Sequence, residues 1–184
     1  VGIYGVDTEH LEGRRAWLSA ALVSSLDETE NGRFRQLSSW MEENERPLID
    51  GMDTRQLVLK IREIGSIMGR LDHVPALPEM KELPHDLVKS VSCREIEVTG
   101  EGDVSIGVMD YGAKENIIRS LAARGCRVVR FPNTTRAEDV ISSGVSGVIL
   151  SNGPGDPSVL DSETEEIRKL LGKRPILGIC LGNQ

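Results

Sequence analysis

The chain has 184 residues, enough for one large domain or two small ones, with a formal net charge of −7 and 28% charged residues. Because charges of both signs are interspersed and the balance is acidic, the composition argues against a nucleic-acid-binding or anionic-membrane surface. No stretch is long and apolar enough for a transmembrane helix, and Val1–Tyr4 does not resemble a signal peptide.

The first third of the chain shows one clear short helix. In Phe34–Met41, the apolar residues Leu37, Trp40 and Met41 follow at intervals of three and one, which fits one face of a helix. A short strand or connector is expected at Pro47–Ile49.

A longer helix is predicted between Asp53 and Gly65. Asp53 or Thr54 can cap its first turn, and Gly65 marks its end. Between them apolar residues recur with helical spacing at Leu57, Ile61 and Ile64. We expect this helix to face the core of the first domain.

Residues 72–103 are expected to connect two domains. This polar, charged stretch is punctuated by Pro75, Pro78 and Pro84, and it holds one short helix candidate at residues 86–91. The predicted organisation is therefore a mixed α/β domain over residues 1–71, the connector over residues 72–103 and a second domain over residues 104–184.

From residue 104 onward, apolar strands alternate with helices. The strands are expected at residues 104–109, 127–131, 147–150 and 176–179. The helices are expected at residues 114–124, 135–143 and 162–171, the last two opening with capping boxes at Thr135–Glu138 and Ser162–Glu165. This alternation predicts the first half of a doubly wound α/β domain, with a parallel sheet, right-handed crossovers and helices on both faces.

Three unusual turns follow these strands, at residues 110–112, 151–157 and 178–182. Because the carboxyl ends of parallel strands meet at one edge of a sheet, we expect the turns to share that edge, where ligands bind. The second turn holds two glycines and two prolines, which favours a rigid path with N–H groups free for an anion or oxyanion. It lacks the Lys-Ser/Thr of a P-loop.

Cys180 is the candidate nucleophile. It lies in Gly-x-Cys-x-Gly after an apolar strand, a pattern typical of a strained elbow that exposes one reactive side chain. Cys93 and Cys126 are expected to be small buried side chains. The three cysteines show no C-x-x-C spacing, so we expect neither a disulfide framework nor a metal site, and we expect a reducing cytoplasm. The histidines of the chain are His10, His73 and His85, and all of them lie before the second domain. We expect them to be structural or surface residues rather than a base for Cys180.

These motifs resemble a known family. Leu150–Pro157 together with Gly178–Gln184 resembles the class I, triad-type glutamine amidotransferase domain. Met109–Ile117 narrows the resemblance to the small, glutaminase subunit of carbamoyl-phosphate synthetase, and Ile49–Leu57 is similar to the N-terminal domain of that subunit. The resemblance extends over nearly all of the chain.

The resemblance implies a glutaminase mechanism. Cys180 would attack the carboxamide of glutamine, and the N–H groups of Leu181 and Gly153 would hold the oxyanion. Gly155 and Gln184 would help to shape the glutamine pocket. Ammonia would pass to a large subunit, in a heterodimer that makes carbamoyl phosphate from bicarbonate and ATP for pyrimidine and arginine biosynthesis. ATP and Mg²⁺ would bind that partner, so no cofactor is expected in this chain.

The sequence also departs from the family pattern. Asn183 stands where many members carry His, and Ile3 replaces a common Asn. The opening strands, which supply a pocket serine, are absent, and the His and Glu of the triad would lie beyond Gln184. The chain also begins with Val1 rather than Met. We therefore expect a fragment with little glutaminase activity of its own.

Two other functions remain open at this stage. One is a different class I amidotransferase or cysteine hydrolase on the same fold, which would not need the N-terminal domain. The other is a non-catalytic module, in which the first half docks a large subunit and the second half is structural.

Overall fold

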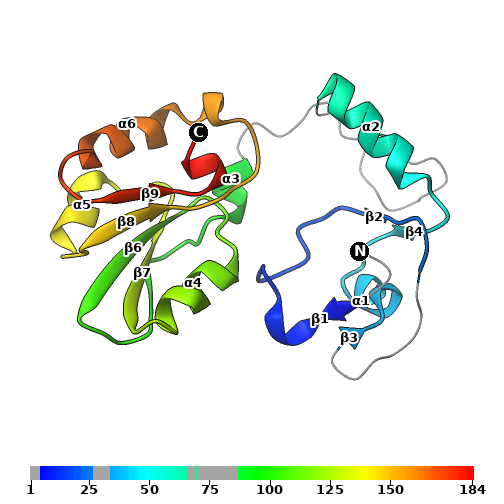
Figure 1. Cartoon of the computed structure of the whole chain (residues 1–184), viewed down its shortest axis with the longest axis horizontal. Coiled ribbons are helices and arrows are strands. Elements are labelled where there is room, and N and C mark those ends of the chain that lie inside the picture. Colours follow the sequence, from blue (N-terminus) through cyan, green and yellow to red (C-terminus); the bar gives the residue numbers. More distant parts are fainter. Residues whose placement is uncertain (1–4, 27–33, 66–68, 70–86) are drawn as a thin grey trace. The chain divides into compact units, whose positions relative to one another are not determined.

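The computed structural model describes residues 5–26, 34–65, 69 and 87–184. The chain divides into two compact units, Val1–Leu83 (unit 1) and Pro84–Gln184 (unit 2), and each is described by itself. The elements of both units are labelled in Figure 1. Several features predicted from the sequence lie outside the described residues, namely His73, His85, Pro75, Pro78 and Pro84.

Unit 1 consists of short elements around a small core. Its elements are β1 (Val6–Asp7), η1 (Thr8–His10), β2 (Ala21–Leu22), β3 (Phe34–Arg35), α1 (Leu37–Glu43), β4 (Leu48–Ile49) and α2 (Thr54–Ile64). Strand β1 pairs antiparallel with β3, and β2 pairs parallel with β4. The buried centre is Val23, Leu37 and Met41, with Trp40 packed against it. The predicted short helix and its apolar face are therefore confirmed.

The helix α2 has the predicted ends but not the predicted burial. The Asp53 carboxylate accepts a hydrogen bond from the Gln56 N–H at 3.0 Å, and Gly65 ends the helix with a φ of 91°. Ile61 and Ile64 are nevertheless 39% and 67% exposed. The expectation of a core-facing helix is wrong for the described part of unit 1, because α1 and the short strands already form its core.

Unit 2 is built on a five-stranded sheet. Its strands are β5 (Glu97–Thr99), β6 (Val104–Asp110), β7 (Cys126–Pro132), β8 (Gly147–Leu150) and β9 (Ile176–Gly178), in the order β5-β7-β6-β8-β9. The strands β6 to β9 pair in parallel, and β5 pairs antiparallel with β7 at one edge. The edge strand β5 lies in the segment from which the sequence predicted only a connector with some local structure.

Helices cover both faces of this sheet. They are α3 (Leu87–Val91), α4 (Glu115–Ala122), α5 (Ala137–Ser142), α6 (Asp161–Leu170) and the short turns η2 (Pro157–Val159) and η3 (Cys180–Gly182). In Figure 1, α6 lies above the sheet and α4 lies below it, and residues of α5 pack in the same buried cluster as residues of α6. The predicted α/β fold with a parallel sheet between helices is confirmed.

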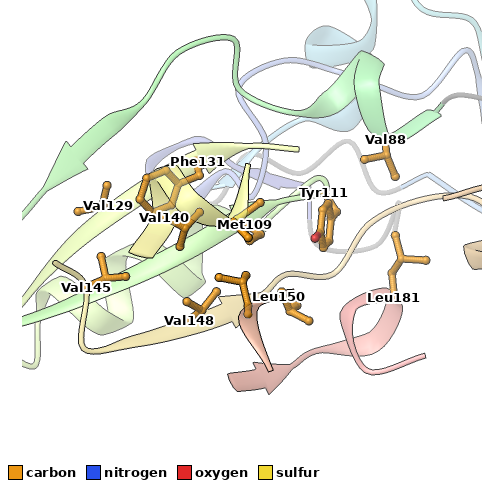
Figure 2. Close-up of a cluster of buried hydrophobic side chains, with 12 residues drawn as sticks. Val88, Met109, Tyr111, Val129, Phe131, Val140, Val145, Val148, Leu150 and Leu181 are labelled. Atoms are coloured by element: carbon orange, nitrogen blue, oxygen red, sulfur yellow. The ribbon is translucent and has the colours of Figure 1, made fainter. Parts of the chain in front are cut away.

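Alternate residues of the strands point to opposite faces and form two cores. On one face Met109, Phe131 and Leu150 pack with residues of α5 and α6, and Figure 2 shows this cluster with Tyr111 and Leu181 at one end. On the other face Val108 and its strand neighbours pack with Ile118 of α4.

The two predicted capping boxes do not form. Arg136 precedes α5 and Leu160 precedes α6, and neither side chain caps its helix. The first N–H of α5, on Ala137, donates instead to the Glu166 carboxylate of α6 at 2.7 Å. A contact between helices thus satisfies the group that a local cap was expected to satisfy.

Candidate functional site

The turn after β6 (residues 110–112, the first turn) is organised by a buried carboxylate. One oxygen of Asp110 accepts hydrogen bonds from the N–H groups of Gly112 at 3.0 Å and Ala113 at 2.8 Å. The other oxygen accepts from the Cys93 N–H at 2.9 Å. Because three donors converge on one buried side chain, this turn has a single well-defined path.

A buried guanidinium balances the charge of Asp110. The Nε atom of Arg130, a residue on β7, lies 3.8 Å from Asp110 Oδ2. Its terminal nitrogens lie 2.9 Å from Glu115 and 3.5 Å from Glu97. The Arg130 side chain is only 4% exposed, so the carboxylates around it compensate a charge that water does not reach.

The loop after β8 (residues 151–157, the Gly/Pro loop) is tied to the first turn by two adjacent side chains. The hydroxyl of Ser151 accepts a hydrogen bond from the Tyr111 N–H at 2.9 Å. The amide of Asn152 accepts from the Lys114 N–H at 3.2 Å and donates to the Gly112 carbonyl at 2.9 Å. The glycines of this loop are evident from the sequence, whereas the contacts of these two side chains, which directly follow an apolar strand, were not predicted.

The turn after β9 (residues 178–182, the elbow) presents Cys180. Its φ of 53° lies in the left-handed region, and its side chain is exposed. The Ile179 N–H donates to the Leu150 carbonyl at 3.0 Å, and the Gly182 N–H donates to the Ser151 carbonyl at 3.1 Å. The elbow predicted from Gly-x-Cys-x-Gly is therefore present, and it is docked on the end of β8.

Both glycines of the elbow lie where no side chain fits. A Cβ atom on Gly178 would lie 2.4 Å from the Gly182 carbonyl oxygen, and one on Gly182 would lie 2.2 Å from the Leu150 carbonyl oxygen. The obstructing atoms are backbone and cannot turn aside. The spacing of glycines around Cys180 therefore has a steric cause.

Gly153 brings the Gly/Pro loop against both other turns. A Cβ atom on it would lie 2.2 Å from the Tyr111 carbonyl oxygen and 2.7 Å from the Leu181 side chain. Within residues 87–184, the N–H groups of Gly153 and Leu181 donate to no backbone or side-chain acceptor. Neither of these two N–H groups is thus paired with an acceptor in that part of the chain.

A cavity of about 400 Å³ opens between α6 and the elbow. Leu181 and Gln184 line it, while Cys180, Gly153 and Gly155 are not among its lining residues. Tyr111 also lines it, and its buried hydroxyl has no hydrogen-bond partner among the described residues. Burial, and then the negative charge of Glu163, raises the pKa of Tyr111 above its usual range. This phenol therefore stays protonated.

The three thiols differ in environment. Burial, followed by the negative charge of Asp110, raises the pKa of Cys93 to about 12. Cys126 is half-buried, and Cys180 is the exposed thiol. His10 lies in unit 1, and the described part of unit 2 contains no histidine.

Among the described residues, two carboxylates and one imidazole lie close together in unit 1. Ligand atoms of Asp7, Glu9 and His10 lie within 4.8 Å of one another, and the first two residues of this group also share a turn in which the Glu9 N–H donates to Asp7. Glu9 and His10 are exposed, and exposed acidic groups such as Glu9 are common without a metal ion.

Comparison with known proteins matches two family models to different parts of the chain. A family model described as glutamine amidotransferase class-I matches residues 107–184, and one described as the CPSase domain of the carbamoyl-phosphate synthase small chain matches residues 1–71. None of the helices in the described ranges is long and apolar enough to cross a membrane.

Three relatives carry the name carbamoyl phosphate synthase small chain. The Syntrophotalea carbinolica protein is 38% identical, over 100% of this chain and 56% of its own length. The Clostridium perfringens protein is 37% identical, over 100% and 55%. The Methanopyrus kandleri protein is 40% identical, over 80% and 45%. The chain thus spans about half the length of the curated relatives it matches.

Proposed function

Because this chain belongs to the carbamoyl-phosphate synthase small chain family, we propose that Cys180 is the nucleophile of a glutaminase that supplies ammonia to a large synthetase subunit. The observation that carries this proposal is the elbow itself. The backbone of Cys180 is left-handed and its thiol is exposed. The N–H groups of Gly153 and Leu181 have no acceptor among the described residues.

The chemistry follows from these groups. The Cys180 thiolate attacks the carboxamide carbon of glutamine, and the carbonyl oxygen becomes an oxyanion that the N–H groups of Gly153 and Leu181 stabilise. The C–N bond then breaks, and the nitrogen leaves as ammonia after it takes up a proton. Water attacks the resulting γ-glutamyl thioester, which releases glutamate and returns the thiol.

Binding and transfer complete the proposal. Gly155 of the Gly/Pro loop and Gln184 after the elbow help to shape the glutamine pocket. The ammonia passes within a heterodimer to the large subunit, which combines it with bicarbonate and ATP in the cytoplasm. ATP and Mg²⁺ belong to that subunit, and the carbamoyl phosphate serves pyrimidine and arginine biosynthesis.

The base that activates Cys180 is not assigned to any described residue. The attacking species is the thiolate, so the rate of attack depends on a base that takes up the proton of the thiol. We therefore expect residues 1–184 alone to hydrolyse glutamine slowly.

The test uses the protein expressed from its own gene together with its large subunit. Glutamine-dependent carbamoyl phosphate synthesis should fall to background in Cys180→Ala, while ammonia-dependent synthesis persists. The Cys126→Ala variant, which removes a half-buried thiol away from the elbow, should retain both activities. Glutamine-dependent synthesis by Cys180→Ala at the wild-type rate would refute the proposal.

A further inference from the structure

Pro154 and Pro157 restrict the backbone of the Gly/Pro loop, but its two glycines have no such restriction of their own. Gly153 and Gly155 each lack a Cβ atom, and Gly155 has a φ of 94°. Glycines reach many conformations at similar energy, so contacts from outside the loop must select one. For an oxyanion donor this selection matters, because a displacement of the order of 1 Å can remove most of its effect.

The residue before Gly153 supplies such contacts. The Asn152 amide uses both of its polar ends on backbone groups of a different loop, the Gly112 carbonyl and the Lys114 N–H. Its NH₂ group faces an acceptor and its oxygen faces a donor, so only an amide satisfies both partners. A carboxylate of the same shape would keep the second contact and oppose a carbonyl at the first.

The first turn, which carries the partners of Asn152, is held in place by several contacts. The Gly112 and Ala113 N–H groups are held by Asp110, which is itself buried against Arg130. Gly112 is also closely surrounded, since a Cβ atom on it would lie 2.8 Å from Val91 and 3.1 Å from Pro154. Asn152 is therefore fastened to a rigid part of unit 2.

Ser151, the residue before Asn152, makes two further hydrogen bonds to the neighbouring turns. Its hydroxyl accepts from the Tyr111 N–H, and its carbonyl accepts from the Gly182 N–H of the elbow. The elbow thus depends on the backbone of Ser151, whereas the Gly153 N–H depends on the side chain of Asn152. A substitution of the Asn152 side chain therefore leaves in place the backbone bond that joins Ser151 to the elbow.

We propose that Asn152 is a positioning residue for glutamine hydrolysis: its amide holds the Gly/Pro loop to the first turn and so keeps the Gly153 N–H aimed at the oxyanion. This inference rests on the proposed function. In the proposed reaction Asn152 contacts neither glutamine nor Cys180, and it acts through Gly153.

The test compares Asn152→Ala and Asn152→Asp in the protein expressed from its own gene with its large subunit. Loss of one oxyanion donor in other enzymes costs roughly 100- to 1,000-fold in kcat, and a misplaced donor should cost roughly 10- to 100-fold. We expect glutamine-dependent kcat to fall roughly 10- to 100-fold in both variants. The KM for glutamine should change less than about threefold, because the oxyanion forms only in the transition state.

Two controls separate positioning from damage to the fold. Alkylation of Cys180 by iodoacetamide forms no oxyanion, so its rate should be unchanged in both variants, as should ammonia-dependent synthesis. Asn44→Ala removes a comparable side-chain bond, to the Trp40 carbonyl at 2.7 Å in unit 1, and should leave kcat unchanged.

The proposal is overturned if kcat stays within about twofold of wild type, or if kcat and the Cys180 alkylation rate fall together, since the elbow would then have moved. Cys180→Ala tests the proposed function independently. If that variant keeps its glutaminase activity, the nucleophile is wrong, whatever the Asn152 variants do.

Discussion

Replacing Gly182 by alanine should destabilise unit 2 while leaving unit 1 unchanged. The new Cβ atom would lie 2.2 Å from the Leu150 oxygen and 2.6 Å from the Leu150 carbonyl carbon, whereas real Cβ contacts essentially never fall below 3.0 Å. The elbow and the end of β8 must therefore separate by at least about 0.8 Å. That shift stretches the Gly182 N–H bond to Ser151, now 3.1 Å, and the Ile179 N–H bond to Leu150, now 3.0 Å.

The magnitude follows from these contacts. Forcing a methyl group into a packed site costs about 1–3 kcal/mol, and each weakened hydrogen bond costs about 1 kcal/mol. For the methyl group and two weakened hydrogen bonds together, we expect a loss of about 3–5 kcal/mol in the free energy of unfolding of unit 2. The matched control is Gly147→Ala on β8, where the nearest atom to the new Cβ would be 3.5 Å away, an ordinary contact.

The assay exploits the cysteines of unit 2. In a urea series, a short pulse of alkylating reagent modifies Cys93 only after the unit opens, because that thiol is 9% exposed. Peptide mass spectrometry then reads the unfolding of unit 2 separately from that of unit 1, in which the sequence has no cysteine. Equal midpoints for Gly182→Ala and Gly147→Ala would refute the reasoning.

Two more predictions concern buried groups of the same unit. Tyr111→Phe removes a hydroxyl that has no partner among the described residues, so the same assay should show unchanged or higher stability, by up to about 2 kcal/mol; a loss above about 1 kcal/mol would mean that the hydroxyl has a partner. The pKa of Cys93 is raised from 9.0 to about 12 in the folded unit, so the folded state binds the proton more tightly than the unfolded chain. Its contribution to stability is full below pH 9 and is lost as the pH rises toward 12. The difference in unfolding free energy between wild type and Cys93→Ala, followed by urea denaturation, should shrink over that range, and a constant difference would contradict the shift.

The sequence predicted the sheet of unit 2 well because its signals are local. Apolar β-branched runs and glycine stops determine where Val104–Asp110 and Gly147–Leu150 begin and end. The same signals place three turns at one edge, since parallel strands all end there. The position of Cys180 followed from these two rules together.

The features that the sequence did not predict depend on distant partners. Ala137 finds its acceptor on Glu166, and Asn152 finds its partners on the first turn, both far along the chain. No local spacing encodes such pairs. The exposure of Ile64 on α2 likewise depends on which elements close the core of unit 1, and helical periodicity alone does not determine that.

The docking of the elbow on β8 also sets an order of events during synthesis. The left-handed conformation of Cys180 costs roughly 1–3 kcal/mol and persists only where surrounding contacts impose it. Those contacts come from Leu150 and Ser151, which leave the ribosome before the elbow does. A growing chain can thus fold β6, β7 and β8 before the elbow exists, and the Cys180 thiol takes its exposed position only as β9 joins the sheet.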